Sequence, residues 1–172
     1  MRENKIIFLD RDGVINQKAP EGDYIKAWKE FELLPRVPKA IRTLNENGWL
    51  VIVITNQRGI ARGMVSIEDV HDIHQKLNDE LKKTKAHIDG FYICPHEKGS
   101  CRCRKPDIGL FLQAEQRFAV DKKQSWMIGD SESDIQAGRR YGIKTIAIGN
   151  YLFGADFCFS DLYKAVCFIV NL

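Results

Sequence analysis

Two aspartates stand two positions apart in the segment DRDG, at the end of a short apolar run. The side chains of Asp10 and Asp12 would leave an extended chain on the same side, and Gly13 lets the chain turn directly after them. Two neighbouring carboxylates repel each other, so the pair favours a divalent cation or a shared proton. Oxygen ligands of this kind suit Mg²⁺. The same letters also fit a solvated turn, and this segment alone does not separate the two interpretations.

Three more reactive side chains follow other apolar runs: Thr55, Lys105 and Asp130. If those runs are parallel strands, their carboxyl ends meet at one edge of the sheet, where ligands bind. Acids combined with a threonine and a lysine suit phosphoryl transfer, in which the carboxylates hold Mg²⁺ and Asp10 attacks phosphorus. Thr55 and Lys105 would neutralise and position the phosphoryl oxygens. We also expect Lys105 to stand immediately before a helix, whose N-terminus favours an anion.

Three cysteines and one histidine lie within the ten residues of the loop 94–103. They are Cys94, His96, Cys101 and Cys103. This set can close a tetrahedral Zn²⁺ site with no open position, which indicates a structural metal. A disulfide and free surface thiols are the alternatives, but the number of cysteines is odd and disulfides are rare in a cytoplasmic chain. We expect zinc to order the loop and to aim Arg104 and Lys105 at the phosphate site.

Short apolar runs alternate with amphipathic stretches along the whole chain. The runs predict strands at 5–10, 49–56, 89–94, 125–130 and 144–149. The amphipathic stretches predict helices at 36–48, 66–84, 107–118 and 131–142, with a final helix at 159–171. This order predicts an α/β fold, a three-layer sandwich in which helices cover both faces of a central parallel sheet.

Four short motifs follow one another along the chain in an order that is known from one superfamily. They are DRDG (10–13), TN (55–56), RKP (104–106) and GDSESD (129–134). With these motifs the chain resembles the phosphatases of the haloacid dehalogenase (HAD) superfamily, over residues 5 to about 149. The resemblance implies a Rossmann-like fold, and no interval between the motifs is long enough for a large cap domain.

The resemblance also implies a role for each acid. Asp10 would be the nucleophile that forms an aspartyl-phosphate, and Asp12 would be the general acid and then the base. Mg²⁺ would be held by Asp10, by the backbone carbonyl of Asp12 and by Asp130. Asp134 would support the site from the next helical turn without touching the metal.

The zinc loop narrows the resemblance to the subgroup that contains heptose bisphosphate and histidinol-phosphate phosphatases. It implies that Asn56, Gln57 and Arg58 contact substrate and that Arg104 binds the phosphate that is not transferred. A bisphosphate needs this extra cation, whereas the amine of histidinol phosphate would favour acids over Arg58. We therefore rank first the removal of the 7-phosphate from D-glycero-D-manno-heptose 1,7-bisphosphate, in the synthesis of precursors of bacterial surface polysaccharides. Histidinol phosphate or another small phosphate ester is the alternative.

Length and charge limit the remaining interpretations. A chain of 172 residues predicts one domain over 1–172, and we expect a monomer. The net charge of +3 is too small to indicate nucleic-acid binding, so the expected partner is a small phosphorylated sugar. No apolar run approaches the roughly 20 residues of a membrane span, and the N-terminus does not resemble a secretory signal, so we expect a cytoplasmic protein.

Two other functions and a few residues stay open. A phospho-acceptor signalling module also combines a parallel sheet with acids, a threonine and a lysine, but Asp12 favours turnover because it can activate water. A zinc nucleic-acid binder is disfavoured, because the sequence lacks a basic face and stacking aromatics beside the zinc loop. We expect His71 and His74 on a solvated helix face, and Trp28 fits either packing or substrate contact.

Overall fold

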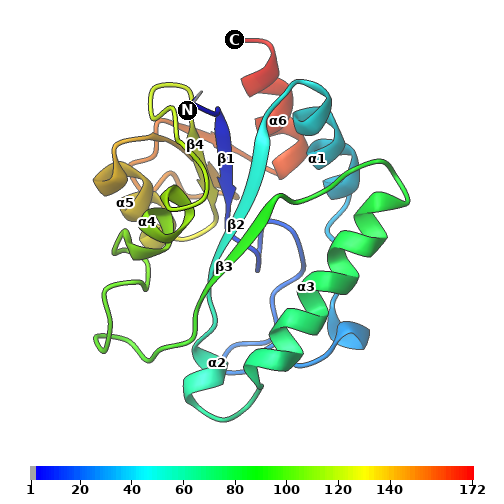
Figure 1. Cartoon of the computed structure of the whole chain (residues 1–172), viewed down its shortest axis with the longest axis vertical. Coiled ribbons are helices and arrows are strands. Elements are labelled where there is room, and N and C mark those ends of the chain that lie inside the picture. Colours follow the sequence, from blue (N-terminus) through cyan, green and yellow to red (C-terminus); the bar gives the residue numbers. More distant parts are fainter. Residues whose placement is uncertain (1–2) are drawn as a thin grey trace.

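One sheet of six parallel strands forms the centre of the molecule (Figure 1). The computed structural model describes residues 3–172. The strands are β1 (Ile6–Leu9), β2 (Leu50–Asn56), β3 (Gly90–Cys94), β4 (Trp126–Gly129), β5 (Lys144–Ile148) and β6 (Phe157–Phe159). They lie side by side in the order β3-β2-β1-β4-β5-β6, and each is parallel to its neighbour.

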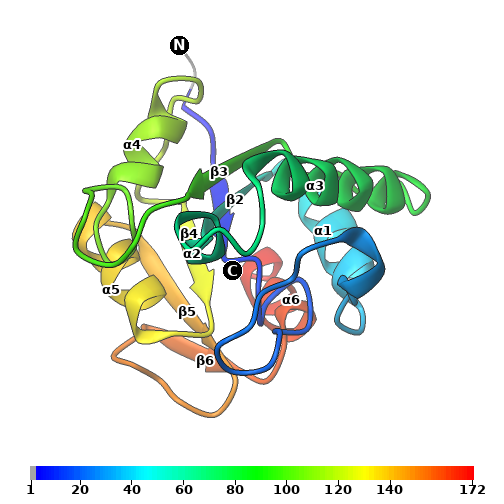
Figure 2. The same ribbon diagram turned by 90° about the horizontal axis from the view of Figure 1, so that it is seen from below.

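Helices cover both faces of this sheet, as Figure 2 shows from below. The α-helices are α1 (Val37–Glu46), α2 (Arg58–Ala61), α3 (Ile67–Lys82), α4 (Gly109–Glu115), α5 (Glu132–Tyr141) and α6 (Leu162–Val170), and a 3₁₀ helix, η1, spans Trp28–Glu30. Residues of α1, α3 and α6 pack on one face of the sheet, and residues of α4 and α5 pack on the other. The predicted three-layer α/β fold is therefore confirmed.

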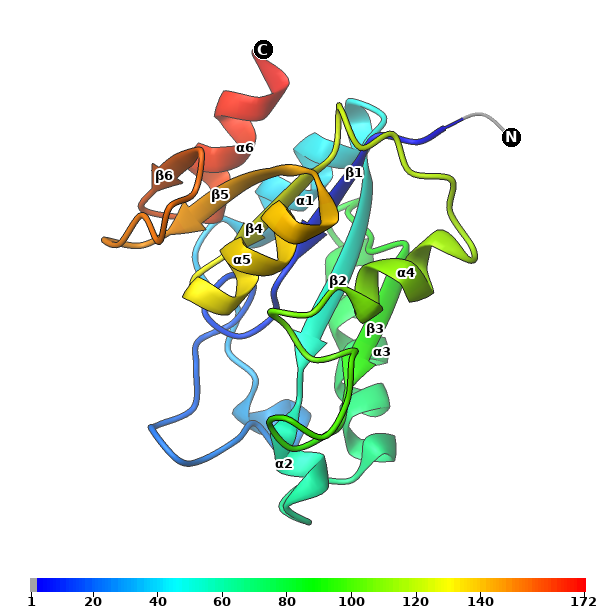
Figure 3. The same cartoon turned by 90° about the vertical axis from the view of Figure 1, so that its left-hand side faces the viewer.

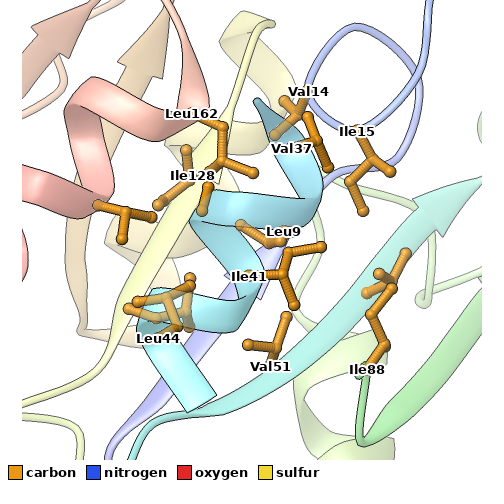
Figure 4. Packing of buried hydrophobic residues seen from close by; sticks show 14 of the residues in the cluster. Leu9, Val14, Ile15, Val37, Ile41, Leu44, Val51, Ile88, Ile128 and Leu162 are labelled. Atoms are coloured by element: carbon orange, nitrogen blue, oxygen red, sulfur yellow. The ribbon is translucent and has the colours of Figure 1, made fainter. Parts of the chain in front are cut away.

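The strands are buried on both faces, which explains their continuous apolar sequences. In β1 all four residues are fully buried, with Ile7 and Leu9 in one core and Ile6 and Phe8 in the other. Figure 4 shows the first core, in which Leu9 lies against residues of α1. Such burial on two sides holds the carboxyl end of β1 firmly in place, and the DRDG segment begins there.

The chain order of the strands reverses between β1 and β4. β2 and β3 extend the sheet on one side of β1, while β4, β5 and β6 extend it on the other. In open parallel sheets a crevice forms at this point, outside the carboxyl ends of the two strands. Asp10 follows β1, and its backbone N–H donates to the carbonyl of Ile128 in β4 at 3.0 Å. The predicted site therefore lies at the reversal point.

Some local predictions were wrong. The tail contains strand β6 before its helix, and α2 directly follows β2. His71 is exposed as expected, but His74 is only 3% exposed. Trp28 stacks on Phe31 with ring centres 5.1 Å apart and packs against the core.

Within residues 3–172, none of the helices has the length and apolar character needed to cross a membrane.

Candidate active site

Three carboxylates and one lysine converge at the reversal point of the sheet. Asp10 follows β1, Asp130 follows β4, and Asp134 lies in the first turn of α5. Each offers an oxygen within 4.8 Å of the other two. Lys105 comes from the segment between β3 and α4, and its Nζ lies 2.9 Å from Asp10 Oδ1 and 2.8 Å from Asp134 Oδ1. Residues from three separate segments thus meet beside one buried ammonium group.

Asn56 fixes the backbone of Lys105. The side chain of Asn56 donates to the Lys105 carbonyl at 3.1 Å and accepts from the Lys105 N–H at 3.0 Å. The Lys105 ammonium also donates to the carbonyl of Ile54 at 2.7 Å. Helix α4 begins only at Gly109, so the expectation that Lys105 stands immediately before a helix is wrong. The end of β2, rather than a helix N-terminus, positions this lysine.

The charges of this cluster do not balance. Burial raises the pKa of Asp10 to about 8, with further contributions from Asp134 and Asp130 that outweigh the opposing effect of Lys105. Burial would lower the pKa of Lys105, but Asp10 and Asp134 raise it, so this residue stays an ammonium. Two carboxylates share that single ammonium, and the cluster as a whole favours an added cation.

Asp130 has an oxygen that is suited to holding such a cation. Its Oδ1 is buried and has no hydrogen-bond partner among residues 3–172, while Oδ2 pairs with the Nζ of Lys18 at 2.5 Å. A buried carboxylate oxygen without a partner is costly. With the oxygens of Asp10 close by, this donor set fits Mg²⁺, which prefers carboxylate and carbonyl ligands.

Asp134 is occupied from two sides. Its Oδ1 pairs with Lys105, and its Oδ2 accepts from the backbone N–H groups of Asp130 and Ser131, both at 3.2 Å. The Ser131 hydroxyl donates to the same oxygen at 2.8 Å, and the bond from the Ser131 N–H is part of a capping box at the start of α5. Asp134 therefore ties the loop after β4 to Lys105, in the supporting position that the fourth motif implied.

Gly13 lets the DRDG segment pass directly beside Asp130. Its φ is +87°, and a Cβ at this position would lie 2.1 Å from Asp130 Oδ2. No side chain fits in that space. The carboxylate of Asp130 can approach Asp10 only because the turn after β1 contains glycine here.

Asp12 has a different environment from Asp10. Its Oδ1 accepts from Arg11 Nη2 at 3.0 Å and from Asn16 Nδ2 at 2.9 Å, and its Oδ2 accepts from Gln57 Nε2 at 2.9 Å. Burial would raise the pKa of Asp12, but the Arg11 guanidinium and these hydrogen bonds hold it below the ordinary value. Arg11 itself is only 1% exposed, and our sequence analysis assigned it no role. The only feature of the sequence that could have indicated a role for Arg11 is its place between two acids, directly after a buried strand.

The residues at the end of β2 and just after it divide into buried side chains and a partly exposed one. Thr55 and Gln57 are buried, and the Gln57 amide donates to Thr55 Oγ1 at 2.8 Å as well as to Asp12. Arg58 lies at the rim, where its Nε donates to the Tyr24 hydroxyl at 3.3 Å and its Nη1 lies 3.4 Å from Glu97. Asn56, Gln57 and Arg58 are the three predicted substrate contacts. In this structure the Asn56 side chain is hydrogen-bonded to the backbone of Lys105, and the Gln57 side chain is hydrogen-bonded to Asp12.

The four predicted zinc ligands come together in the loop after β3. The sulfur and Nδ1 atoms of Cys94, His96, Cys101 and Cys103 lie within 4.8 Å of one another, and five of the separations are 3.2–3.7 Å. Ligands of tetrahedral Zn²⁺ at a Zn–S length of about 2.3 Å stand about 3.7 Å apart, so the arrangement fits this ion. All five cysteines lie within 3–172 and all are free, so the disulfide alternative is wrong for this structure.

A basic cavity of about 560 Å³ opens beside Lys105. The zinc loop forms one wall, and Figure 3 shows this segment running past α2. Its charged lining consists of Arg58, Lys98, Arg104, Lys105, Asp107 and Glu132. Four cations face two acids, so the cavity suits an anion larger than one phosphate group. The half-buried side chain of Arg104 donates to the His96 carbonyl at 3.5 Å, which links it to the zinc loop.

Sequence comparison finds related proteins over most of the chain. A D-glycero-beta-D-manno-heptose-1,7-bisphosphate 7-phosphatase of Rhodopseudomonas palustris is 40% identical over 144 residues, covering 79% of this chain and 78% of the relative. A D-glycero-alpha-D-manno-heptose-1,7-bisphosphate 7-phosphatase of Mycobacterium bovis is 37% identical over 167 residues, covering 92% of this chain and 87% of the relative. The family model described as HAD-hydrolase-like matches residues 102–152.

Solved structures agree with the sequence comparison. A D,D-heptose 1,7-bisphosphate phosphatase from B. bronchiseptica, crystallised with magnesium and phosphate, superposes with a TM-score of 0.89 at 29% identity. The match covers 97% of this chain and 98% of that one. A heptose 1,7-bisphosphate phosphatase from Burkholderia thailandensis matches 98% of this chain with a TM-score of 0.71 at 25% identity.

Proposed function

We infer that this chain, which belongs to the heptose-1,7-bisphosphate 7-phosphatase family of HAD-like hydrolases, removes the 7-phosphate from D-glycero-D-manno-heptose 1,7-bisphosphate. The observation that carries the proposal is the cluster of Asp10, Asp130 and Asp134 beside the buried Lys105, with one Asp130 oxygen unpartnered among residues 3–172. A phosphatase of this class needs a nucleophile, a cation site and a fixed ammonium in one place.

Asp10, Asp130 and the backbone carbonyl of Asp12 would hold Mg²⁺. The bound ion would supply positive charge that offsets the carboxylates and the incoming phosphoryl group. The B. bronchiseptica relative was crystallised with magnesium and phosphate, which supports this assignment. In the proposed reaction Lys105 and Thr55 contact the phosphoryl oxygens.

The chemistry proceeds in two half-reactions. First, an Asp10 oxygen attacks phosphorus, the bond from phosphorus to the sugar oxygen breaks, and Asp12 gives that oxygen a proton. Second, water attacks phosphorus, its proton passes to Asp12, and the bond between phosphorus and Asp10 breaks. Asp12 is a carboxylate in the free protein, because Arg11 lowers its pKa. The proton for the first step can arrive with the substrate, since a phosphate monoester has a second pKa of about 6.

The basic cavity favours a bisphosphate over histidinol phosphate. Arg104, Arg58 and Lys98 line it beyond Lys105, so a second phosphate has cations to contact. A substrate with a cationic amine would meet the same positive charge. The relatives include enzymes named for both the alpha and the beta anomer at similar identity, so the comparisons do not choose between the anomers.

The test is a phosphate-release assay with Mg²⁺ on heptose 1,7-bisphosphate (both anomers), fructose 1,6-bisphosphate and histidinol phosphate. We expect the highest kcat/KM with a heptose bisphosphate. Asp10→Asn should lower phosphate release by at least about 10³-fold, because it removes the nucleophile. The matched control is Asp72→Asn, which alters an exposed carboxylate paired with Lys76 on α3 and should keep wild-type rates.

Two outcomes would contradict the proposal. A preference for histidinol phosphate would overturn the substrate assignment and leave the chemistry intact. Substantial turnover by a folded Asp10→Asn variant would exclude Asp10 as the nucleophile.

A further inference from the structure

A buried arginine stands behind the proposed general acid. The Arg11 side chain is 1% exposed, and its Nε and Nη2 both point to Asp12 Oδ1, at 3.4 and 3.0 Å. The guanidinium also lies over the ring of Phe31, 5.7 Å from its centre. Its remaining terminal nitrogen, Nη1, lies 3.2 Å from Nε2 of His74. Arg11 therefore connects Asp12 to His74, which lies 63 positions after Arg11 in the chain.

His74 comes from α3 and is itself buried. Its ring stacks on Phe91 of β3, with centres 4.4 Å apart and planes 15° apart. Burial, followed by the charge of Arg11, lowers the pKa of His74 to about 3, so the imidazole is neutral. A neutral imidazole can accept a hydrogen bond at one nitrogen, and an arginine can only donate. Nε2 is therefore the acceptor for Arg11.

We propose that His74 is a positioning residue for the general acid Asp12, acting through Arg11. His74 holds the guanidinium, which in turn engages Oδ1 of Asp12. Oδ2 then faces Gln57, whose amide also contacts Thr55, and this is the side on which the phosphoryl group would lie. The inference rests on the proposed phosphatase function and adds to it a residue on a distant helix.

A purely structural role does not explain the choice of histidine. An apolar ring would stack on Phe91 equally well, and it would leave no buried nitrogen unsatisfied. His74 Nδ1 is buried and has no hydrogen-bond partner among residues 3–172, which costs stability. The polar atom that does find a partner is the one that reaches Arg11. The imidazole thus has a use at Arg11 that an apolar side chain would not provide.

The test compares two esters that differ in how much they need an acid. Phenol, with a pKa of about 10, leaves poorly without a proton, whereas p-nitrophenol is more acidic and needs little help. We would measure kcat/KM for phenyl phosphate and p-nitrophenyl phosphate, since this ratio reports the half-reaction in which the ester bond breaks. His74→Phe keeps the ring stacking and removes the acceptor. His74→Gln keeps an acceptor oxygen.

We expect His74→Phe to lower kcat/KM for phenyl phosphate by about tenfold and for p-nitrophenyl phosphate by less than about twofold. His74→Gln should recover most of the loss. His71→Phe, on the exposed side of the same helix, is the control and should behave as wild type. If His74→Phe does not fold, His74→Leu is measured with the same two esters.

Each contrary result has a distinct meaning. An equal loss with both esters, or no loss with either, would overturn the role of His74. A wild-type protein that releases phosphate from neither ester nor from any sugar phosphate would instead overturn the proposed function, and the positioning role with it.

Discussion

Asp10 and Asp12 stand two residues apart, yet their surroundings move their pKa values in opposite directions. Burial and two neighbouring carboxylates raise the pKa of Asp10, whereas Arg11 and hydrogen-bond donors outweigh burial at Asp12 and lower it. Asp10 therefore needs a nearby cation to ionise, whereas Asp12 beside it ionises readily. This separation is typical of paired carboxylates with different roles in one site.

Gly13 allows a prediction at the same scale. Gly13→Ala should abolish measurable Mg²⁺ affinity and lower kcat/KM by at least about 100-fold, because the new Cβ would overlap Asp130. Gly142→Ala is the matched control, since Gly142 has a φ of +89° but nothing within 4 Å of its added Cβ. Gly142→Ala should lose about 1 kcal/mol of unfolding free energy through backbone strain, and Gly13→Ala should lose more because its Cβ also overlaps Asp130. Isothermal titration with Mg²⁺ would check this, and equal Mg²⁺ affinity in the two variants would contradict it.

At the scale of elements, the end of β2 and the zinc loop position different groups. Asn56 and the carbonyl of Ile54 hold Lys105, so this lysine does not depend on the zinc loop alone. Arg104, by contrast, reaches back to His96 within the loop. The expectation that zinc aims both residues is therefore too simple, because β2 anchors one of them.

Loss of zinc should consequently affect binding more than chemistry. We expect Cys101→Ser to lower the zinc content and to raise KM for the bisphosphate at least about fivefold, while kcat stays within about threefold. Cys158→Ser, a half-buried free thiol outside the loop, should retain zinc and a normal KM. Metal analysis combined with steady-state kinetics tests this. A zinc-free protein with an unchanged KM would show that the loop has no part in binding substrate.

At the scale of the whole molecule, the acidic cluster couples stability to pH and to Mg²⁺. The pKa of Asp10 rises from 3.8 to about 8 on folding, so the folded state keeps a proton that the unfolded chain releases. This contribution of Asp10 falls as pH rises from about 4 to about 8, but below about 6.5 the buried His74, whose pKa folding lowers to about 3, has the opposite effect. The metal-free protein should therefore lose stability mainly between about pH 6.5 and 8, and the loss should level off above that. Bound Mg²⁺ would reverse the effect.

Thermal unfolding at two pH values tests this coupling. Saturation of the site requires the Asp10 carboxylate, so Mg²⁺ affinity should fall by up to about tenfold for each pH unit below about 8. At a fixed, subsaturating Mg²⁺ concentration, we expect a larger rise in Tm at pH 8.5 than at pH 6. An equal rise at the two pH values would mean that Asp10 does not exchange a proton for the ion.

Much of the architecture could be read from local patterns. Apolar runs such as 49–56 predict a strand buried on two faces. Gly48 marks the end of the helix before this strand, and Ser66 marks the start of the helix at 66–84. Short elements with weak periodicity escaped the prediction: β6 has three residues and α2 has four. Their formation depends on pairing with β5 and on the turn after β2, which the local sequence does not encode.

The sequence by itself determined which residues could do chemistry and at which edge of the sheet they meet, because strand order in a parallel sheet fixes where carboxyl ends lie. It did not determine the partners of those residues. The burial of Arg11 and His74, the attachment of Asn56 to Lys105, and the different environments of Asp10 and Asp12 arise from contacts between segments far apart in the chain. Such contacts depend on the packing of whole elements, and only the tertiary structure decides them.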